Sequence, residues 1–185
     1  MNRRHGLIVI SAALLATQRS GAAQDAPWPS RPLRLIVTGG AGGVPDIRAR
    51  WLAERLAPAL GQPVLVENRP GAGGSIGMAE AARSAPDGYT VAVVHQGTMA
   101  INPHLYARIG YDPLADFTPL TRLGVGGLLL AVHPELPAKS VAELVQLARS
   151  KPGALKYGSP GIGTPPHMAA ELFLRLAGIE ATHVP

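Results

Sequence analysis

The sequence has no cysteine, few aromatic residues and little charge. Without cysteine among its 185 residues, the chain has no disulfide bonds, no zinc sites built on cysteine and no thiol nucleophile. Aromatic residues make up 4% of the sequence and charged residues 16%, which argues against base stacking and a basic nucleic-acid surface. Glycine (22) and proline (18) are frequent, but less so than in disordered chains. With 46% hydrophobic residues, the sequence predicts a folded domain.

Residues 1–23 have the layout of a secretory signal peptide. A basic start at Arg3 and Arg4 precedes an apolar run over residues 6–16 and small residues up to Ala23, after which we expect cleavage. The apolar run is too short to cross a bilayer, which needs about 20 residues. Cleavage would leave 14 basic and 12 acidic residues, a net charge of +2, in a protein secreted to the periplasm. Sec and twin-arginine export both stay open.

Short apolar runs alternate with helical patterns after residue 24. This alternation predicts a parallel sheet with helices on both faces. We expect a first lobe over residues 24–110, a turn-rich connector over 111–119 and a second, incomplete lobe over 120–185. Predicted strands cover residues 33–37, 64–66, 90–94, 120–123, 128–132, 155–157 and 181–184, and predicted helices cover 45–60, 75–83, 97–105, 140–150 and 165–176. Ser140, with Glu143 three residues on, predicts a cap at the start of the fourth helix. The predicted buried face of the fifth helix consists of Met168, Ala169, Leu172, Phe173 and Leu176.

Four glycine-rich turns follow predicted strands, at residues 39–43, 71–74, 97–98 and 158–164. The carboxyl ends of parallel strands are where open α/β sheets bind ligands, and the backbone amides there, with the positive end of a helix, favour an anion. In any single turn, the glycines are also explained by a tight backbone turn that needs glycine. The predicted ligand-binding residues are Gly42, Gly43, Asp46, Gly73, Gly74, Ser75, Gly97, Thr98, Ser159, Gly161, Gly163, Thr164 and His167.

Other kinds of site have weaker support. Residues 73–77 match GxSxG, the nucleophile turn of serine hydrolases with Ser75 as nucleophile, but that turn should follow its strand directly. No phosphate-binding glycine motif is complete. The histidines lack metal-ligand spacing, so we expect no metal site. We also expect no cofactor and no catalytic residues. Asp46 could pair with a cationic ligand group or could stabilise the start of its helix.

Several motifs in the mature chain resemble those of one family. The most specific are ENRPGAGG at residues 67–74 and APDGYT at residues 85–90. The resemblance is to the Bug-type periplasmic receptors of tripartite tricarboxylate transporters. The other stretches that carry it are residues 28–32, 35–37, 41–46, 49–50, 61–64, 100–103, 105–106, 111–113, 116–117, 136–140, 157–159, 161, 163–164 and 183–185.

The resemblance implies a two-lobed periplasmic binding protein of type II, the Venus flytrap fold. Such a receptor is not an enzyme: it is a monomer when complete, closes on a small organic carboxylate and delivers it to a membrane permease of one large and one small subunit. Family members are longer, so the chain resembles a receptor truncated at its C-terminus. A role as a ligand-presenting sensor for a membrane signalling protein would look the same in sequence. Pro160 and Ile162 stand where the family more often has small or polar residues, which suggests a more apolar ligand.

Overall fold

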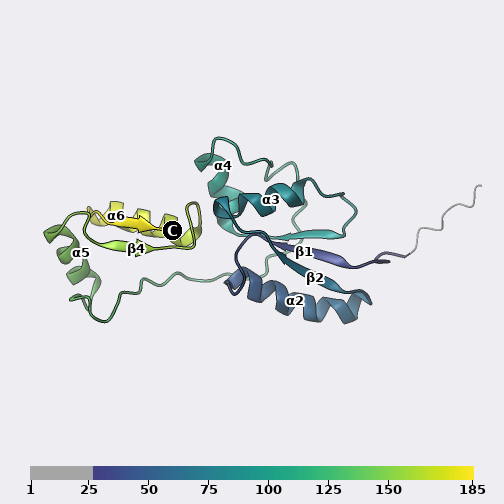
Figure 1. The fold of residues 1–185 in the computed structure, drawn as a ribbon, viewed down its shortest axis with the longest axis horizontal. Helices are drawn as coiled ribbons and strands as arrows, with labels where there is room; N and C mark the ends of the chain where they lie inside the picture. The colour runs from purple at the N-terminus through teal and green to yellow at the C-terminus, as the bar shows by residue number, and fades with distance from the viewer. Residues whose placement is uncertain (1–26) are drawn as a thin grey trace, which may run out of the picture. The chain divides into compact units, whose positions relative to one another are not determined.

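The computed structural model describes residues 27–185 (Figure 1). The predicted signal peptide lies outside the described residues. Residues 31–185 group into one unit by their contacts, and all helices and strands described below belong to it. Among the described residues, no helix is long and apolar enough to cross a membrane.

A parallel three-stranded sheet occupies the first part of this unit. Its strands are β1 (Leu33–Val37), β2 (Val64–Asn68) and β3 (Thr90–Val93), in the order β2-β1-β3. Leu35 of β1 is in register with Val66 of β2 and Val91 of β3. The predicted strands and their parallel pairing are therefore confirmed.

Each strand of this sheet is followed by a helix. They are α2 (Val44–Leu60), α3 (Ser75–Ala82), and a π-helical turn over Gly97–Ile101 that continues into α4 (Asn102–Leu105). Helix α2 ends at Gly61, whose φ of +65° suits glycine. A short 3-10 turn over Ala72–Gly74 precedes α3. These helices match the predicted ones to within about two residues.

Helices α2 and α3 cover the sheet. Val37 and Val93 form a buried cluster with Ala49 of α2, and Val66 packs against it. Ile36 is fully buried as well, and successive side chains along a strand point to opposite faces. The sheet is therefore buried on both faces, as a parallel sheet with helices on both sides requires.

A second parallel sheet contains β4 (Lys156–Gly158) and β5 (Thr182–Val184). It is accompanied by α5 (Val141–Ser150) and α6 (Pro165–Ala177). The predicted cap of α5 is confirmed, because Ser140 Oγ accepts a hydrogen bond from Glu143 N at 3.2 Å. Glu143 Oε2 accepts from Lys139 N at 2.6 Å, one residue before the cap. The two sheets lie on either side of residues 111–119 in the chain, while the division into lobes stays a prediction.

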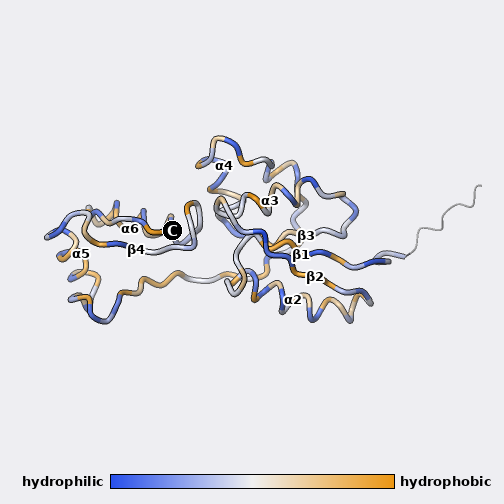
Figure 2. Tube along the Cα trace, in the orientation of Figure 1, coloured by the Kyte–Doolittle hydropathy of each residue, from blue (hydrophilic) through white to orange (hydrophobic). Residues whose placement is uncertain are grey.

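Two expectations for this part of the chain are wrong. Residues 120–132 form no strand and run as an extended segment (Figure 1), with Leu129 97% exposed. Figure 2 shows hydrophobic residues along this segment. A strand needs a hydrogen-bonded neighbour, and the described residues offer none there. The predicted buried face of α6 is also exposed, including Leu172 and Leu176, because two strands of three residues cannot cover a helix of 13.

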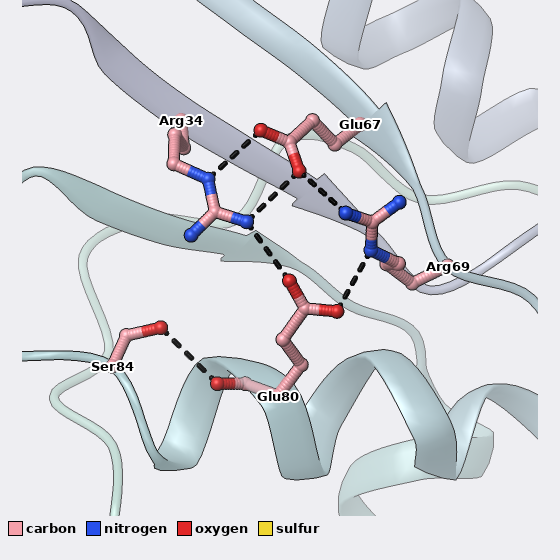
Figure 3. A network of polar contacts seen from close by, with 5 residues as sticks. All are labelled: Arg34, Glu67, Arg69, Glu80 and Ser84. Atoms are coloured by element: carbon pink, nitrogen blue, oxygen red, sulfur yellow. Dashed lines mark hydrogen bonds and ion pairs between the residues drawn. The ribbon is translucent and has the colours of Figure 1, made fainter.

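Four side chains of alternating charge join β1, β2 and α3 (Figure 3). Arg34 of β1 donates to Glu67 Oε1 and Oε2 and to Glu80 Oε1, all at 2.8 Å. Arg69 donates to Glu80 Oε2 at 2.7 Å and to Glu67 Oε2 at 2.9 Å. The hydrogen bonds from Arg34 lower the pKa of Glu67. Burial alone would raise the pKa of Glu80, but hydrogen bonds from Arg69 and Arg34 outweigh it and lower that pKa.

We expect Glu80→Gln to lower the free energy of unfolding by about 1 kcal/mol at neutral pH, since the network is partly exposed. A lowered folded pKa means that the stabilisation is present above the unfolded pKa and is lost as pH falls. The difference from the wild type should therefore shrink between about pH 6 and pH 3. Urea unfolding followed by circular dichroism measures it. The exposed Glu54→Gln on α2 is the control, and equal losses in both variants would contradict a role for the network.

Candidate functional site

Three of the predicted glycine turns lie at the same edge of the first sheet. They follow β1, β2 and β3, and these strands are parallel, so their carboxyl ends meet at one edge. The turn after β4 is held against two of them. Tyr106 Oη, at the end of α4, donates to Ile162 O at 3.2 Å. A Cβ added at Gly73 would lie 2.5 Å from the same Ile162 oxygen.

Asn102 at the start of α4 lies between these turns. Its side chain is fully buried, and Nδ2 donates to Gly73 O at 3.0 Å and to Ser75 Oγ at 2.9 Å. A Cβ at Gly163 would collide with Asn102 Oδ1, so glycine is needed for this close approach. Sequence reasoning missed Asn102 as a site residue, because the sequence places it only within the predicted helix over residues 97–105 and the family motif over 100–103.

The hydroxyl groups of Ser75 and Thr98 are buried in this cluster. Ser75 Oγ accepts from Asn102, and residues 69–74 separate it from β2, so the geometry does not place it as the nucleophile turn requires. Thr98 Oγ1 donates to His95 O at 2.8 Å, and Tyr111 Oη donates to Thr98 O at 2.5 Å. The Ser75 hydroxyl therefore connects the start of α3 with α4, whereas the Thr98 hydroxyl stabilises its own turn.

Gly42, Gly43 and Asp46 belong to a separate hydrogen-bonded group in the turn after β1. Asp46 is 3% exposed, and its Oδ2 accepts from Gly42 N at 2.8 Å and from Arg50 Nε at 3.1 Å. Asn68 at the end of β2 donates to Gly39 O at 3.1 Å, and Arg50 Nη2 donates to Asn68 Oδ1 at 3.2 Å. This group clamps the turn against β2.

The hydrogen bond from Arg50, followed by that from the Gly42 amide, lowers the pKa of Asp46 to about 2. The carboxylate is therefore ionised and already paired at neutral pH. This supports its role at the start of α2 rather than as a partner for a cationic ligand.

Several amides predicted to face an anion donate inside their own turns. Gly42 N donates to Asp46, Gly74 N to Gly71 O at 2.9 Å, and Gly97 N to His95 Nδ1 at 3.0 Å. Burial lowers the pKa of His95, which favours the neutral ring that accepts this bond. An anion would therefore have to compete for these amides, a cost that the sequence does not reveal.

The turn after β4 carries the remaining predicted residues. Ser159 Oγ lies 2.7 Å from His183 Nε2 and accepts from Gly161 N at 3.2 Å. Thr164 Oγ1 donates to Gly161 O at 2.7 Å. The ring of His167, in the first turn of α6, lies 4.4 Å from that of His183 between centroids. His183 is a second residue that the predicted site omitted.

A cavity of about 410 Å³ lies beside Thr98 but is lined by none of the predicted ligand residues; its lining is Met99, Pro103, His104, Ile109, Tyr111, Asp112, Pro113 and Leu114. In residues 27–185, no group of three or more histidine or acidic side chains is arranged to hold a metal ion. The predicted residues thus form contacts within and between turns rather than the lining of this cavity.

The hydrogen-bonded group around Asp46, which clamps the turn after β1, predicts that the stability of the protein depends on pH. Because the folded pKa of Asp46 is lowered to about 2 from 3.8, its contribution is present above the unfolded pKa and is lost as pH falls through the folded one. We expect Asp46→Asn to unfold at lower urea concentration than the wild type at pH 6, with a gap that narrows steadily as pH falls toward 2. Glu180→Gln, at an exposed position, should follow the wild-type curve. A constant gap between Asp46→Asn and wild type down to pH 2 would contradict the clamp.

Comparison with known proteins agrees with the family resemblance. The family model described as "Tripartite tricarboxylate transporter family receptor" matches residues 48–185. A UPF0065 protein of Bordetella pertussis is 36% identical over 96% of this chain and 54% of its own length. Protein BugT of the same organism is 34% identical, over 97% of this chain and 56% of its own.

Solved structures of similar proteins share the fold. MatC from Rhodopseudomonas palustris, solved with bound malate, superposes with a TM-score of 0.80 at 33% identity and covers 85% of this chain and 54% of its own. Rpa4515 from R. palustris, solved with adipate, gives 0.76 at 37% identity, over 85% of this chain and 53% of its own. These neighbours confirm a periplasmic binding protein fold, of which this chain covers a part.

The chain spans about half the length of the curated relatives that it matches. The family description is that of a receptor and not of an enzyme. Since the family match covers well over half of the sequence, the chain belongs to the tripartite tricarboxylate transporter receptor family.

Proposed function

We propose that the protein is a periplasmic receptor that captures a small organic carboxylate and delivers it to the permease subunits of a tripartite transporter. The observation that carries this proposal is the similarity to MatC, a family neighbour solved with malate, at a TM-score of 0.80. The adipate-bound Rpa4515 supports a dicarboxylate as the ligand class. An N-terminal signal over residues 1–23 would supply export.

The ligand site that we propose lies where the turns after β2, β3 and β4 approach Asn102. Gly73, Gly97 and Gly163 leave no room there for side chains, so the ligand would meet backbone groups and the hydroxyl groups of Ser75, Thr98, Ser159 and Thr164. It would have to displace the hydrogen bonds that Ser75 and Thr98 make. Carboxylates suit such a surface because amides and hydroxyl groups donate to oxygen anions. The remaining proposed ligand residues are Gly42, Gly43, Gly74, Gly161 and His167. Asp46 is not kept among them, because its carboxylate is already paired with Gly42 and Arg50.

Ile162 gives this site an apolar element. Its side chain is 47% exposed, although its own carbonyl is held by Tyr106. An exposed aliphatic side chain in a carboxylate-binding turn favours a ligand with a methylene chain over one with hydroxyl groups. Within the dicarboxylate class, we therefore propose adipate-like ligands ahead of malate-like ones.

Isothermal titration calorimetry on the full-length receptor tests the proposal. We expect at least one of malate, adipate and citrate to bind with a dissociation constant in the micromolar range or tighter, with adipate tighter than malate. Succinamide, which has no carboxylate, should give no heat. The absence of binding to every carboxylate, under conditions where circular dichroism shows a folded protein, would reject the receptor function.

Two glycine variants test the place of the site. Gly163 and Gly153 both have positive φ, +82° and +71°, but only at Gly163 would a Cβ collide with Asn102, whereas Gly153 has open space. We expect Gly163→Ala and Gly153→Ala to share a backbone cost of about 1 kcal/mol. Only Gly163→Ala should also weaken ligand binding, by about tenfold or more. Equal affinities in the two variants would show that the ligand does not bind at this turn.

A further inference from the structure

Five polar side chains cluster where β4, β5 and the first turns of α6 meet. This histidine cluster consists of Tyr157, Ser159, His167, Glu171 and His183. Ser159 Oγ lies 2.7 Å from His183 Nε2. His183 stacks on Tyr157 with ring centroids 4.9 Å apart and planes at 28°, and the His167 ring lies 4.4 Å away. The imidazole of His183 is thus held by two rings while one of its nitrogens meets the Ser159 hydroxyl.

The hydroxyl of Ser159 has a single proton, and its neighbours decide where that proton points. Gly161 N donates to Ser159 Oγ at 3.2 Å, which uses one acceptor position of the oxygen. If His183 Nε2 is unprotonated, the hydroxyl donates to it, because this 2.7 Å contact is much shorter than the 3.3 Å to Gly161 O. If Nε2 carries a proton, it donates to Oγ instead, and the hydroxyl proton becomes free to donate to another acceptor.

We propose that His183 is a positioning residue that sets the donor role of the Ser159 hydroxyl, so that protonation of His183 Nε2 makes this hydroxyl a donor to a bound carboxylate. This inference rests on the proposed function and names a residue that acts on the ligand through another. A neutral ring with its proton on Nε2 would donate to Ser159 as well, but the negative charge of a bound carboxylate favours the charged imidazolium form. Carboxylate binding and protonation therefore favour each other, and binding should draw a proton onto the histidine cluster.

The groups that face His183 decide how this proton is held. Glu171 Oε1 lies 4.0 Å from His167 Nε2, so the nearest negative charge of the cluster lies beside His167. Two imidazolium rings in contact would repel each other, which disfavours charge on both rings at once. A carboxylate bound at Ser159 lies on the His183 side and favours the charge there. Binding thus increases proton uptake by the pair and shifts the proton toward His183.

Tyr157 does not take part in this titration. Its hydroxyl donates to Glu171 Oε1, and burial, together with that carboxylate, raises the pKa of Tyr157 to about 12. The tyrosine therefore remains a neutral donor across the physiological range. Its ring serves as the surface on which His183 is stacked, while histidine is the side chain whose charge changes between about pH 5 and 8.

The test measures proton uptake on ligand binding by the full-length receptor. Calorimetry with malate and with adipate, in buffers of different ionisation enthalpy between pH 6.5 and 8, should show uptake of a fraction of a proton and an affinity roughly fivefold weaker at pH 8. His183→Gln keeps an N–H donor toward Ser159 but cannot titrate, so it should bind without proton uptake or pH dependence. Ser159→Ala should lose both affinity and uptake.

His133→Gln is the matched control, because His133 is an exposed histidine with a side chain 74% accessible; its proton uptake should equal that of the wild type. Binding by the wild type without proton uptake, or uptake that persists in His183→Gln, would overturn the proposal and leave the receptor function intact. If malate, adipate and citrate all fail to bind, the receptor function fails, and a measurement without ligand decides whether His183 Nε2 and Ser159 Oγ are hydrogen-bonded. The ¹⁵N signal of His183 Nε2 should then move in Ser159→Ala, and an unchanged signal would overturn it.

Discussion

The parallel pairing of β1 with β2 on one side and with β3 on the other is the constraint on which the rest of the first sheet depends. Leu33, Leu35, Ile36 and Val37 of the central strand are all buried, so the strand needs a helix layer on each face. Parallel strands also need a crossover connection, and α2 and α3 provide it. All three turns after these strands therefore lie at one edge, where a ligand site can form from backbone groups.

The glycines are present because the turns pack closely against one another, and not because a ligand needs free backbone amides there. Gly73 and Gly163 sit where a side chain would collide with Asn102 or with the neighbouring turn. The amides of Gly42, Gly74 and Gly97 already have acceptors in their own turns. Glycine here permits backbone to pack on backbone around one buried amide side chain, and any carboxylate would replace hydrogen bonds that exist.

Charge is used in two different ways. The network of Arg34, Glu67, Arg69 and Glu80 balances its charges and is partly buried between the sheet and α3. The Asp46 group likewise pairs a carboxylate with an arginine, and this pair stabilises the turn after β1. The cluster around His183 is different, because the 2.7 Å contact between His183 Nε2 and Ser159 Oγ can be donated from either side. Structural support and adjustable hydrogen bonding are thus assigned to separate parts of the chain.

Local patterns determined the helices and strands of the first sheet, the cap at Ser140 and the family, because these depend on neighbours in sequence and on motifs such as residues 67–74. They failed for residues 120–132, since an apolar run becomes a strand only if another strand lies beside it. They also missed Asn102 and His183. Asn102 contacts Gly73, 29 residues away, and His183 contacts Ser159, 24 residues away. Only the tertiary structure decided these contacts, because chain folding and not spacing brings such groups within hydrogen-bond distance.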